Sequence, residues 1–233
     1  MSIVDDVARV RARIADAVKR RGPGPDVTLL GVSKRQPTSA IREAAAAGLV
    51  DVGENYAQEL RDKRRELAAL PLRWHFIGPV QTNKVKYVVG CTLVHTVDRV
   101  ELIEALDARA DRSGIDQDVL VQVNVAGEAT KHGAAPTDVP ALLDRFASCA
   151  RLQCRGLMVI PPLLEPEATR PHFAALRRLR DELARTGRPR VALDVLSMGM
   201  SADFEVAIEE GATLVRVGTA LFGSRSDGRD AVA

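Results

Sequence analysis

One lysine ends an apolar run, where its amine could act as a nucleophile. Residues 27–34 read VTLLGVSK, and alternation along a strand places Leu30, Val32 and Lys34 on one face. If that face lines a barrel, the amine lies at the barrel mouth above an apolar layer. Desolvation lowers the pKa of a lysine, and the free amine can form a Schiff base with an aldehyde. The alternative is a surface lysine paired with an acidic neighbour.

Two segments near the carboxyl end of the chain could bind an anion. Residues 197–201 read SMGMS and residues 218–223 read GTALFG, and each follows an apolar run. Glycine allows close backbone approach, while hydroxyls and free amides attract phosphate. Each segment alone is common architecture, and Ser201 also has the residue type of a helix N-cap. Together the segments predict a phosphate site. Its candidate ligands are Ser197, Ser201, Gly218 and Thr219.

An arginine occupies the apolar run of residues 213–218, where an unpaired guanidinium is costly. Arg216 must therefore meet either a ligand atom or a carboxylate such as Glu54 or Asp194. Asn55 and His75 lie near the ends of two earlier runs and are expected close to the same site, although a histidine there is more often structural. The histidines lack the spacing of metal ligands, so no metal site is predicted.

Short apolar runs alternate along the chain with longer segments of helical periodicity. Strict alternation of strand and helix predicts parallel strands with right-handed crossovers, and eight units are the number that closes a barrel. We therefore predict an α/β fold that is a single (βα)8 TIM barrel, with its chemistry at the carboxyl ends of the strands. The eight runs are residues 27–34, 51–56, 73–78, 92–98, 118–124, 152–160, 191–198 and 213–218.

An open doubly wound sheet is the competing architecture, but it usually carries a glycine fingerprint after its first strand. The corresponding turn reads GVSKRQPT, and the chain contains neither GxGxxG nor GxxxxGK[ST]. We find no linker that marks a domain boundary, so residues 1–223 are predicted to form one domain. Residues 2–21 form an extra helix before the first strand, residues 171–187 form a later helix, and residues 224–233 form a short polar tail.

Composition argues against several classes of function. A net charge of +2 and an aromatic content of 3% argue against a nucleic-acid binder and an aromatic membrane belt. The basic and acidic residues of segments 61–66 and 177–182 are interleaved, as on solvated helix faces. No export signal is visible, and no apolar run approaches the ~20 residues of a membrane span. We therefore expect a cytoplasmic protein that binds a small anion, without nucleic-acid or membrane partners. Its cysteines, Cys91, Cys149 and Cys154, are predicted to be reduced core residues.

Several motifs together resemble one known family. They are GVSK, GENYAQE, WHFIGPVQTNK, LSMGMSADFEVAIEEGAT and VRVGTALFG. With these motifs the chain closely resembles the YggS/PROSC family of pyridoxal 5'-phosphate (PLP) homeostasis proteins, from the first helix to Gly223. The resemblance implies a fold-type III barrel, like the amino-terminal domain of alanine racemase, that holds PLP without an established catalytic activity.

The same resemblance implies roles for individual residues. Lys34 matches the Schiff-base lysine, and Arg216 matches the group that faces the pyridine nitrogen. Asn55 and His75 match motif positions that line the cofactor pocket. The segment of residues 161–170 matches no motif. The residues that match the phosphate ligands are Ser197, Ser201, Gly218 and Thr219.

Three functions follow from these residues. The first is a non-catalytic carrier in vitamin B6 homeostasis, which holds PLP as a reversible Schiff base on Lys34 and hands it to apo PLP-dependent enzymes. The second is a low-activity amino-acid racemase, with Tyr56 as its tyrosine candidate for acid or base. An arginine on the pyridine nitrogen weakens the electron sink, and we expect no second domain to supply an opposite group.

The third function is a class I aldolase or phosphosugar enzyme on the same fold. Of the three functions we expect the first, and we expect the protein to be a monomeric carrier of PLP. The sequence leaves open whether Lys131 or another lysine provides a second PLP site.

Overall fold

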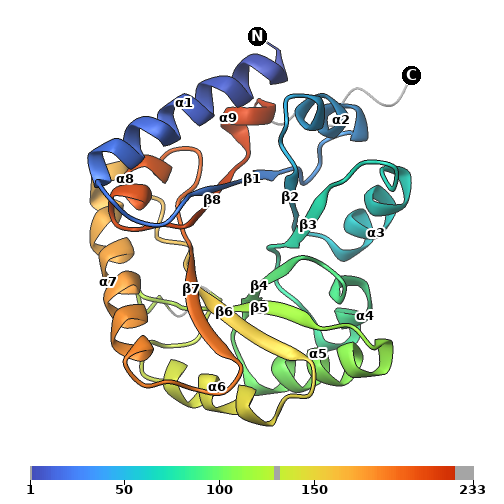
Figure 1. The fold of residues 1–233 in the computed structure, drawn as a ribbon, viewed down its shortest axis with the longest axis vertical. Coiled ribbons are helices and arrows are strands. Elements are labelled where there is room, and N and C mark those ends of the chain that lie inside the picture. Colours follow the sequence, from blue (N-terminus) through green and yellow to red (C-terminus); the bar gives the residue numbers. More distant parts are fainter. Residues whose placement is uncertain (1, 129–131, 224–233) are drawn as a thin grey trace.

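The computed structural model describes residues 2–128 and 132–223, and eight parallel strands in these ranges close into a barrel (Figure 1). The strands follow one another around the barrel in chain order, and the first strand pairs with the last to close it. Helical connections form an outer ring around the strands (Figure 1). This is the arrangement of a (βα)8 barrel, so the predicted fold class is confirmed.

Short strands alternate with helices from the first helix onward. The strands are β1 (Thr28–Val32), β2 (Asp51–Glu54), β3 (Arg73–Phe76), β4 (Leu93–Val97), β5 (Gln117–Gln122), β6 (Leu152–Met158), β7 (Val191–Ser197) and β8 (Leu214–Val217). The helices are α1 (Ile3–Arg21), α2 (Thr38–Ala46), α3 (Ala57–Glu66), α4 (Val85–Val88), α5 (Val100–Ser113), α6 (Val139–Arg145), α7 (Pro166–Ala184), α8 (Phe204–Glu209) and α9 (Thr219–Phe222). Two single turns of 3-10 helix are Thr82–Lys84 and Phe146–Ser148.

Alternate residues of the strands point into the barrel and fill it with an apolar layer. Parallel barrels are packed in this way, so the interior is a core and not a pore. On β1 the inward side chains are Leu30 and Val32, and the same alternation continues toward Lys34. The buried members of the layer are Leu30, Ile77, Leu93, Leu120, Met158 and Leu214.

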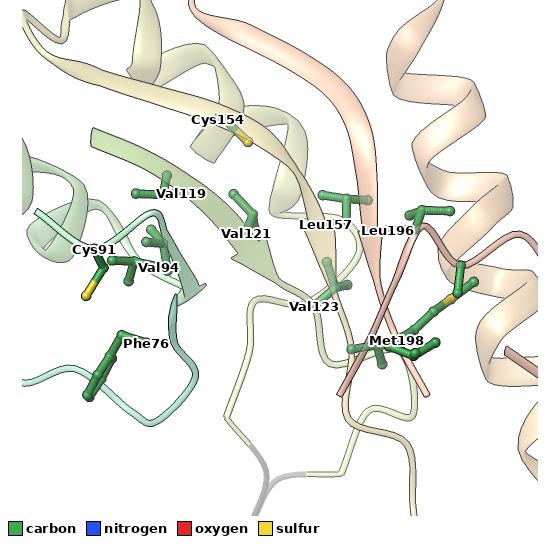
Figure 2. Close-up of a cluster of buried hydrophobic side chains, with 14 of the residues drawn as sticks. Phe76, Cys91, Val94, Val119, Val121, Val123, Cys154, Leu157, Leu196 and Met198 are labelled. Atoms are coloured by element: carbon green, nitrogen blue, oxygen red, sulfur yellow. The ribbon is translucent and has the colours of Figure 1, made fainter. Parts of the chain in front are cut away.

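The opposite faces of the strands form the larger core, between the barrel and the helices. Figure 2 shows part of this core, with Val119 and Val121 of β5 near Leu157 of β6 and Leu196 of β7. Strands covered on both faces read as continuous apolar runs, which is why the sequence pattern marked them clearly.

The three cysteines belong to the buried part of the molecule. Cys91, Cys149 and Cys154 are all buried and free. Burial raises the pKa of the Cys91 and Cys154 thiols to about 12 and that of Cys149 to about 11. The prediction of reduced core cysteines is therefore confirmed.

Helix α1 is the predicted extra helix before the first strand. Ser2 caps it, because its hydroxyl accepts from the amide of Asp5 while the Asp5 carboxylate accepts from the amide of Ser2. α1 packs against α2, α8 and α9 (Figure 1) and so covers the seam where β8 meets β1. Its buried face, at helical spacing, consists of Val7, Val10, Ile14 and Ala17.

The structure differs from the sequence prediction at the start of α7. The helix begins at Pro166 and not at residue 171, so half of the segment that matched no motif is helical. A proline at the first helical position loses no hydrogen bond, and Pro166 is therefore the start signal. Residues 224–233, predicted to be a polar tail, and Lys131 lie outside the described residues.

Candidate functional site

The carboxyl ends of β1 and β8 lie side by side at one mouth of the barrel. Leu30 of β1 is in register with Arg216 of β8. A Cβ built on Gly218 would lie 3.5 Å from that of Val32. Lys34 follows β1 in a turn and is half-buried. The structure therefore brings the lysine, the arginine and the glycine loop to one edge of the mouth.

The turn that carries Lys34 is held by its neighbour Arg35. Arg35 adopts the left-handed conformation, with φ of +58°, which is uncommon for a residue other than glycine. Its backbone amide donates to Glu59 Oε1 at 2.6 Å, and its guanidinium donates to the hydroxyl of Tyr56 at 3.2 Å. These contacts fix the backbone directly after the lysine.

A buried ion cluster lies behind this turn. Lys63 Nζ donates to Glu54 Oε1 at 2.8 Å, to Glu59 Oε1 at 2.7 Å and to the carbonyl of Ser33 at 2.7 Å. Burial raises the pKa of Glu54, although the charge of Lys63 opposes this. The prediction of a solvated face for residues 61–66 is wrong for Lys63, whose side chain is 8% exposed. Its position on α3 turns it toward the acidic end of β2, where the ammonium is desolvated but paired.

Arg216 is buried inside the barrel mouth. Its Nη1 donates to the carbonyl and to Oγ of Ser197, each at 2.8 Å, and its Nη2 donates to the carbonyl of Val159 at 2.8 Å. Burial lowers the pKa of Arg216 to about 10. The alternative of an ion pair with Glu54 or Asp194 is wrong, because both carboxylates bind other cations.

The guanidinium of Arg216 retains unused hydrogen-bond donors. It carries five N–H groups. Within residues 2–128 and 132–223, three of these are used by Ser197 and Val159. Two donors are thus left for a ligand at the mouth.

The loops after β7 and β8 meet through a single hydroxyl. Ser201 Oγ accepts hydrogen bonds from the amides of Gly218 at 3.2 Å and Ala220 at 3.3 Å. The N-cap of α8 is Asp203 and not Ser201, which corrects the prediction by two residues. The carboxylate of Asp203 instead accepts from the amide of Met200 at 2.6 Å, which closes the loop and leaves Ser201 directed at β8.

Glycine is required in the loop after β7. Gly199 has a φ of +91°, and a Cβ there would lie 2.6 Å from Cβ of Ala207. Its carbonyl accepts from the amide of Arg216 at 3.0 Å. Thr219, the first residue of α9, is exposed next to this loop. The loop can therefore lie against β8 and leave Ser201 and Thr219 on the same side.

A cavity of about 830 Å³ opens over the carboxyl ends of β2 to β5. Asn55 lines this cavity, and its Oδ1 is buried without a hydrogen-bond partner among the described residues. Gly78 packs on it so closely that a Cβ would lie 2.0 Å from the carbonyl oxygen of Asn55. Asn55 therefore carries a buried acceptor without a partner among the described residues, next to this cavity.

Comparison with known proteins assigns the family. Residues 6–226 match the family model for the N-terminal domain of alanine racemase. The chain is 50% identical over 228 residues to a pyridoxal phosphate homeostasis protein of Aquifex aeolicus, covering 97% of this chain and 99% of the relative. A second such protein, from Pseudomonas aeruginosa, is 48% identical over 233 residues and covers 99% of both chains. This chain belongs to the pyridoxal phosphate homeostasis protein family.

The family includes solved structures. PipY of Synechococcus elongatus, solved with PLP bound, superposes with a TM-score of 0.84 at 40% identity, covering 95% of this chain and 100% of PipY. The predicted family and the fold-type III barrel are thereby confirmed. In the part of the chain that the structure describes, no helix is long and apolar enough to cross a membrane.

Two predicted site residues of this family member lie deeper in the barrel than the loops. The hydroxyl of Ser197 is buried against Arg216 and His95, since Ser197 is an inward-facing residue of β7. His75 lies within β3, where it contacts His95 and Asp51 and does not end the strand. Their roles as phosphate and pocket ligands stay predictions.

Sequence reasoning missed two members of this buried group. His95 and Asp51 were treated only as parts of apolar runs, because neither has a recognisable motif spacing. The available signal was positional, since His75 and His95 both occupy inward positions on adjacent strands.

Proposed function

We propose that this chain binds PLP at the carboxyl ends of β1, β7 and β8 and acts in PLP homeostasis. The observation that carries the proposal is that Lys34 follows β1 directly beside β8, the strand that carries Arg216 and leads into the loop held by Ser201. These groups fit the aldehyde, the phosphate and the pyridine nitrogen of PLP. The PLP-bound structure of PipY, at 40% identity, supports the same ligand.

Lys34 is the residue that would hold PLP covalently. When bound, PLP supplies an aldehyde that condenses with a primary amine, with loss of water, and is released when water is added back. Lys34 is half-buried above the apolar layer, so its ammonium is partly shielded from solvent. Arg35 and the cluster around Lys63 fix its backbone and thereby direct the amine toward the mouth.

The loops after β7 and β8 would hold the phosphate. Ser201 Oγ already accepts from two amides, so its own proton is available to donate to a phosphate oxygen. The exposed Thr219 follows at the start of α9 and offers a second hydroxyl, while the amide of Gly218 orients Ser201 Oγ. Such clustered hydroxyls and amides are the usual protein ligands of phosphate in this fold.

Arg216 supports a carrier more than a catalyst. Its two remaining N–H groups can donate to the pyridine nitrogen, but an arginine does not release a proton at neutral pH. The nitrogen then stays unprotonated and the ring withdraws electrons weakly, which disfavours amino-acid chemistry. We infer a cytoplasmic, monomeric, non-catalytic protein that hands PLP to apo-enzymes.

Borohydride trapping tests the proposed site. The purified protein, loaded with PLP, is reduced and digested, and the modified peptide is identified by mass spectrometry. We expect the label on Lys34 and its loss in Lys34→Ala. Lys84→Ala is the matched control, because Lys84 lines the neighbouring cavity. Absence of a label on Lys34 in a protein that has been incubated with PLP would contradict the proposal.

A transfer assay separates a carrier from a passive binder. We expect the loaded protein to activate an apo PLP-dependent enzyme faster than PLP dissociates into buffer. Activation limited by that dissociation rate would remove direct transfer from the proposal and leave storage of PLP.

A low-activity racemase is the second candidate, and the position of Tyr56 favours it. Its side chain is 47% exposed, and its hydroxyl accepts from Arg35, the residue after Lys34. A tyrosine at that place could exchange a proton with a bound amino acid. Racemisation of any member of a panel of D- and L-amino acids that is lost in both Tyr56→Phe and Lys34→Ala would establish this activity.

A further inference from the structure

Five polar side chains are joined end to end through the interior of the barrel. Asp51 Oδ1 lies 3.1 Å from His75 Nε2, and His75 Nδ1 lies 3.0 Å from His95 Nε2. His95 Nδ1 lies 3.0 Å from Ser197 Oγ, which accepts from Arg216 at 2.8 Å. All five residues are at most 5% exposed.

This chain of hydrogen-bonded side chains connects the two mouths of the barrel. Its lower end, Asp51 and His75, lines a cavity of about 290 Å³ at the amino-terminal mouth, together with Arg73, Asp118 and Arg155. Its upper end is Arg216 at the carboxyl mouth. The leucines of the interior layer surround its middle, so the chain crosses an otherwise apolar core.

The two ends fix the direction of every hydrogen bond in the chain. Arg216 can only donate, and an ionised Asp51 can only accept. The hydrogen bonds from His75 and Arg73 outweigh the effect of burial and lower the pKa of Asp51, which keeps it ionised.

The protons of Ser197, His95 and His75 then have one consistent arrangement. Ser197 Oγ accepts from Arg216 and donates to His95 Nδ1, so the proton of His95 is on Nε2. His95 Nε2 donates to His75 Nδ1, and His75 Nε2 donates to Asp51. Burial, with the nearby charge of Arg216, lowers the pKa of His95 well below its usual value, so this ring is neutral.

We propose that Asp51, His75, His95 and Ser197 are positioning residues that orient Arg216 toward bound PLP through this one-directional chain. The inference rests on the proposed function. Ser197 takes both Nη1 protons of Arg216, which turns the remaining donors of the guanidinium away from the barrel wall. The hydroxyl of Ser197 is itself oriented only because His95 accepts from it.

Protonation of the chain disturbs this orientation. If the imidazole of His95 gains a proton, both of its ring nitrogens become donors. His95 can then no longer accept at Nδ1, and Ser197 loses the acceptor that fixes its hydroxyl. The groups that bear on this titration are Arg73, Asp118 and Arg155 around the lower cavity, and Asp203, whose charge acts on Arg216. PLP affinity should therefore fall on acidification more steeply in the wild type than in a protein whose chain is interrupted.

The first test uses the protein without PLP. Nitrogen-15 NMR of labelled histidine distinguishes protonated from bare ring nitrogens. Variants His132→Gln and His172→Gln remove the two other histidine signals. We expect His75 and His95 to be protonated on Nε2 and bare on Nδ1 at neutral pH. A proton on Nδ1 of either ring would overturn the proposal, whether or not the protein binds PLP.

The second test measures PLP affinity in matched variants. Ser197→Ala and His95→Leu remove one link each, and we expect each to weaken affinity by about 3- to 10-fold, the value of one hydrogen bond. His95→Asn retains an acceptor near the Nδ1 position and should remain within about twofold of wild type. Thr169→Val, which removes a buried hydroxyl on α7, is the control for loss of a hydroxyl alone.

The pH profile completes this second test. PLP itself titrates in both proteins, so the ratio of wild-type to Ser197→Ala affinity reports only the contribution of the hydrogen-bonded side chains. We expect this ratio to decrease on acidification. A pH-independent ratio, or wild-type affinity in Ser197→Ala and His95→Leu, would overturn the positioning role while leaving PLP binding intact. Failure of the proposed function is distinguished by a wild-type protein that is not labelled on Lys34.

Discussion

Two cations are buried near the carboxyl mouth of the barrel, and their hydrogen bonds are satisfied in different ways. Lys63 lies outside the barrel wall, and its three ammonium protons meet acceptors on Ser33, Glu54 and Glu59. Arg216 lies inside the wall, and the described residues use three of its five donors. All three donors of Lys63 are therefore used, although Oε2 of Glu54 has no partner among the described residues, whereas two donors of Arg216 are not used.

This difference shows that burial of a charge does not by itself identify a binding site. Both residues are buried, with at most 6% of the whole residue exposed, so desolvation of the two charges is similar. What differs is the number of donors left after the fold has formed. Lys63 therefore supports the backbone next to Lys34, and under the proposed function Arg216 is the cation that binds the ligand.

Removal of the Lys63 charge is expected to have the largest effect. Lys63→Met leaves Glu54 buried without its cation, which should lower the free energy of unfolding by about 3–5 kcal/mol. Urea unfolding measures this change. The double variant Lys63→Met, Glu54→Gln should recover much of the loss, because no unpaired charge remains. A loss below about 1 kcal/mol in the single variant would contradict the interpretation that Lys63 stabilises the fold by pairing with the buried Glu54.

Removal of the Arg216 charge is expected to act mainly on the ligand. Arg216→Met should weaken PLP binding by about 10- to 100-fold, as expected for hydrogen bonds from a charged donor. Titration of the protein with PLP, followed by absorbance, provides the measurement. Arg216→Lys keeps a cation without the planar fork and should have an intermediate affinity. Equal affinity in the methionine variant would place the pyridine nitrogen elsewhere.

The carboxylates of the two clusters should respond to acid with opposite signs. Asp51 has a lowered pKa when folded, because hydrogen bonds from His75 and Arg73 outweigh its burial. Its stabilisation is full above about pH 4 and is lost as the pH falls through the folded pKa. Burial raises the pKa of Glu54, so its contribution is present at low pH and is lost as the pH rises through the folded pKa.

Urea unfolding at a series of pH values measures this contrast. The difference between wild type and Asp51→Asn should narrow on acidification. For Glu54→Gln, acidification should instead raise the free energy of unfolding of the wild type relative to that of the variant. The same sign for both variants would mean that one of the two environments is misassigned.

The smallest effect is expected for a cation on the exposed side of α3. Arg61 pairs with Asp62 at the surface, where its side chain is 52% exposed. Arg61→Ala should change the free energy of unfolding by less than about 0.5 kcal/mol, since solvent screens such a pair. Together, Arg61→Ala and Lys63→Met compare the loss of a surface cation with the loss of a buried cation on the same helix. A loss equal to that of Lys63→Met would show that burial is not the cause of the difference.

Much of the fold could be predicted from the pattern of residues. Seven of the eight predicted runs contain a whole strand, and β5 begins one residue before its run, because both faces of a barrel strand are buried and such strands are rich in apolar residues. The end of β1 could also be predicted, because the alternation of Leu30 and Val32 continues to Lys34. The start of α7 was missed, because the prediction took Pro171 and not Pro166 as the start signal.

The location of candidate residues could be predicted where they follow the end of a strand. Lys34, Arg216 and the loops carrying Ser201 and Gly218 lie at the carboxyl mouth as expected, because the barrel brings all carboxyl ends to one mouth, while their roles as PLP ligands stay predictions. The partners of Arg216 were not found. They are a carbonyl of Val159 and two atoms of Ser197, and no residue-type pattern marks a carbonyl as an acceptor.

The sequence itself specified the order of the elements and the residue types at their ends, because strand and helix periods and turn residues are local properties. Only the tertiary structure established which buried polar groups meet. Asp51 and Arg216 stand far apart in the chain, yet closure of the barrel places them at the two ends of one hydrogen-bonded path. The cause is geometric, since inward-facing residues of different strands become neighbours only when the sheet closes on itself.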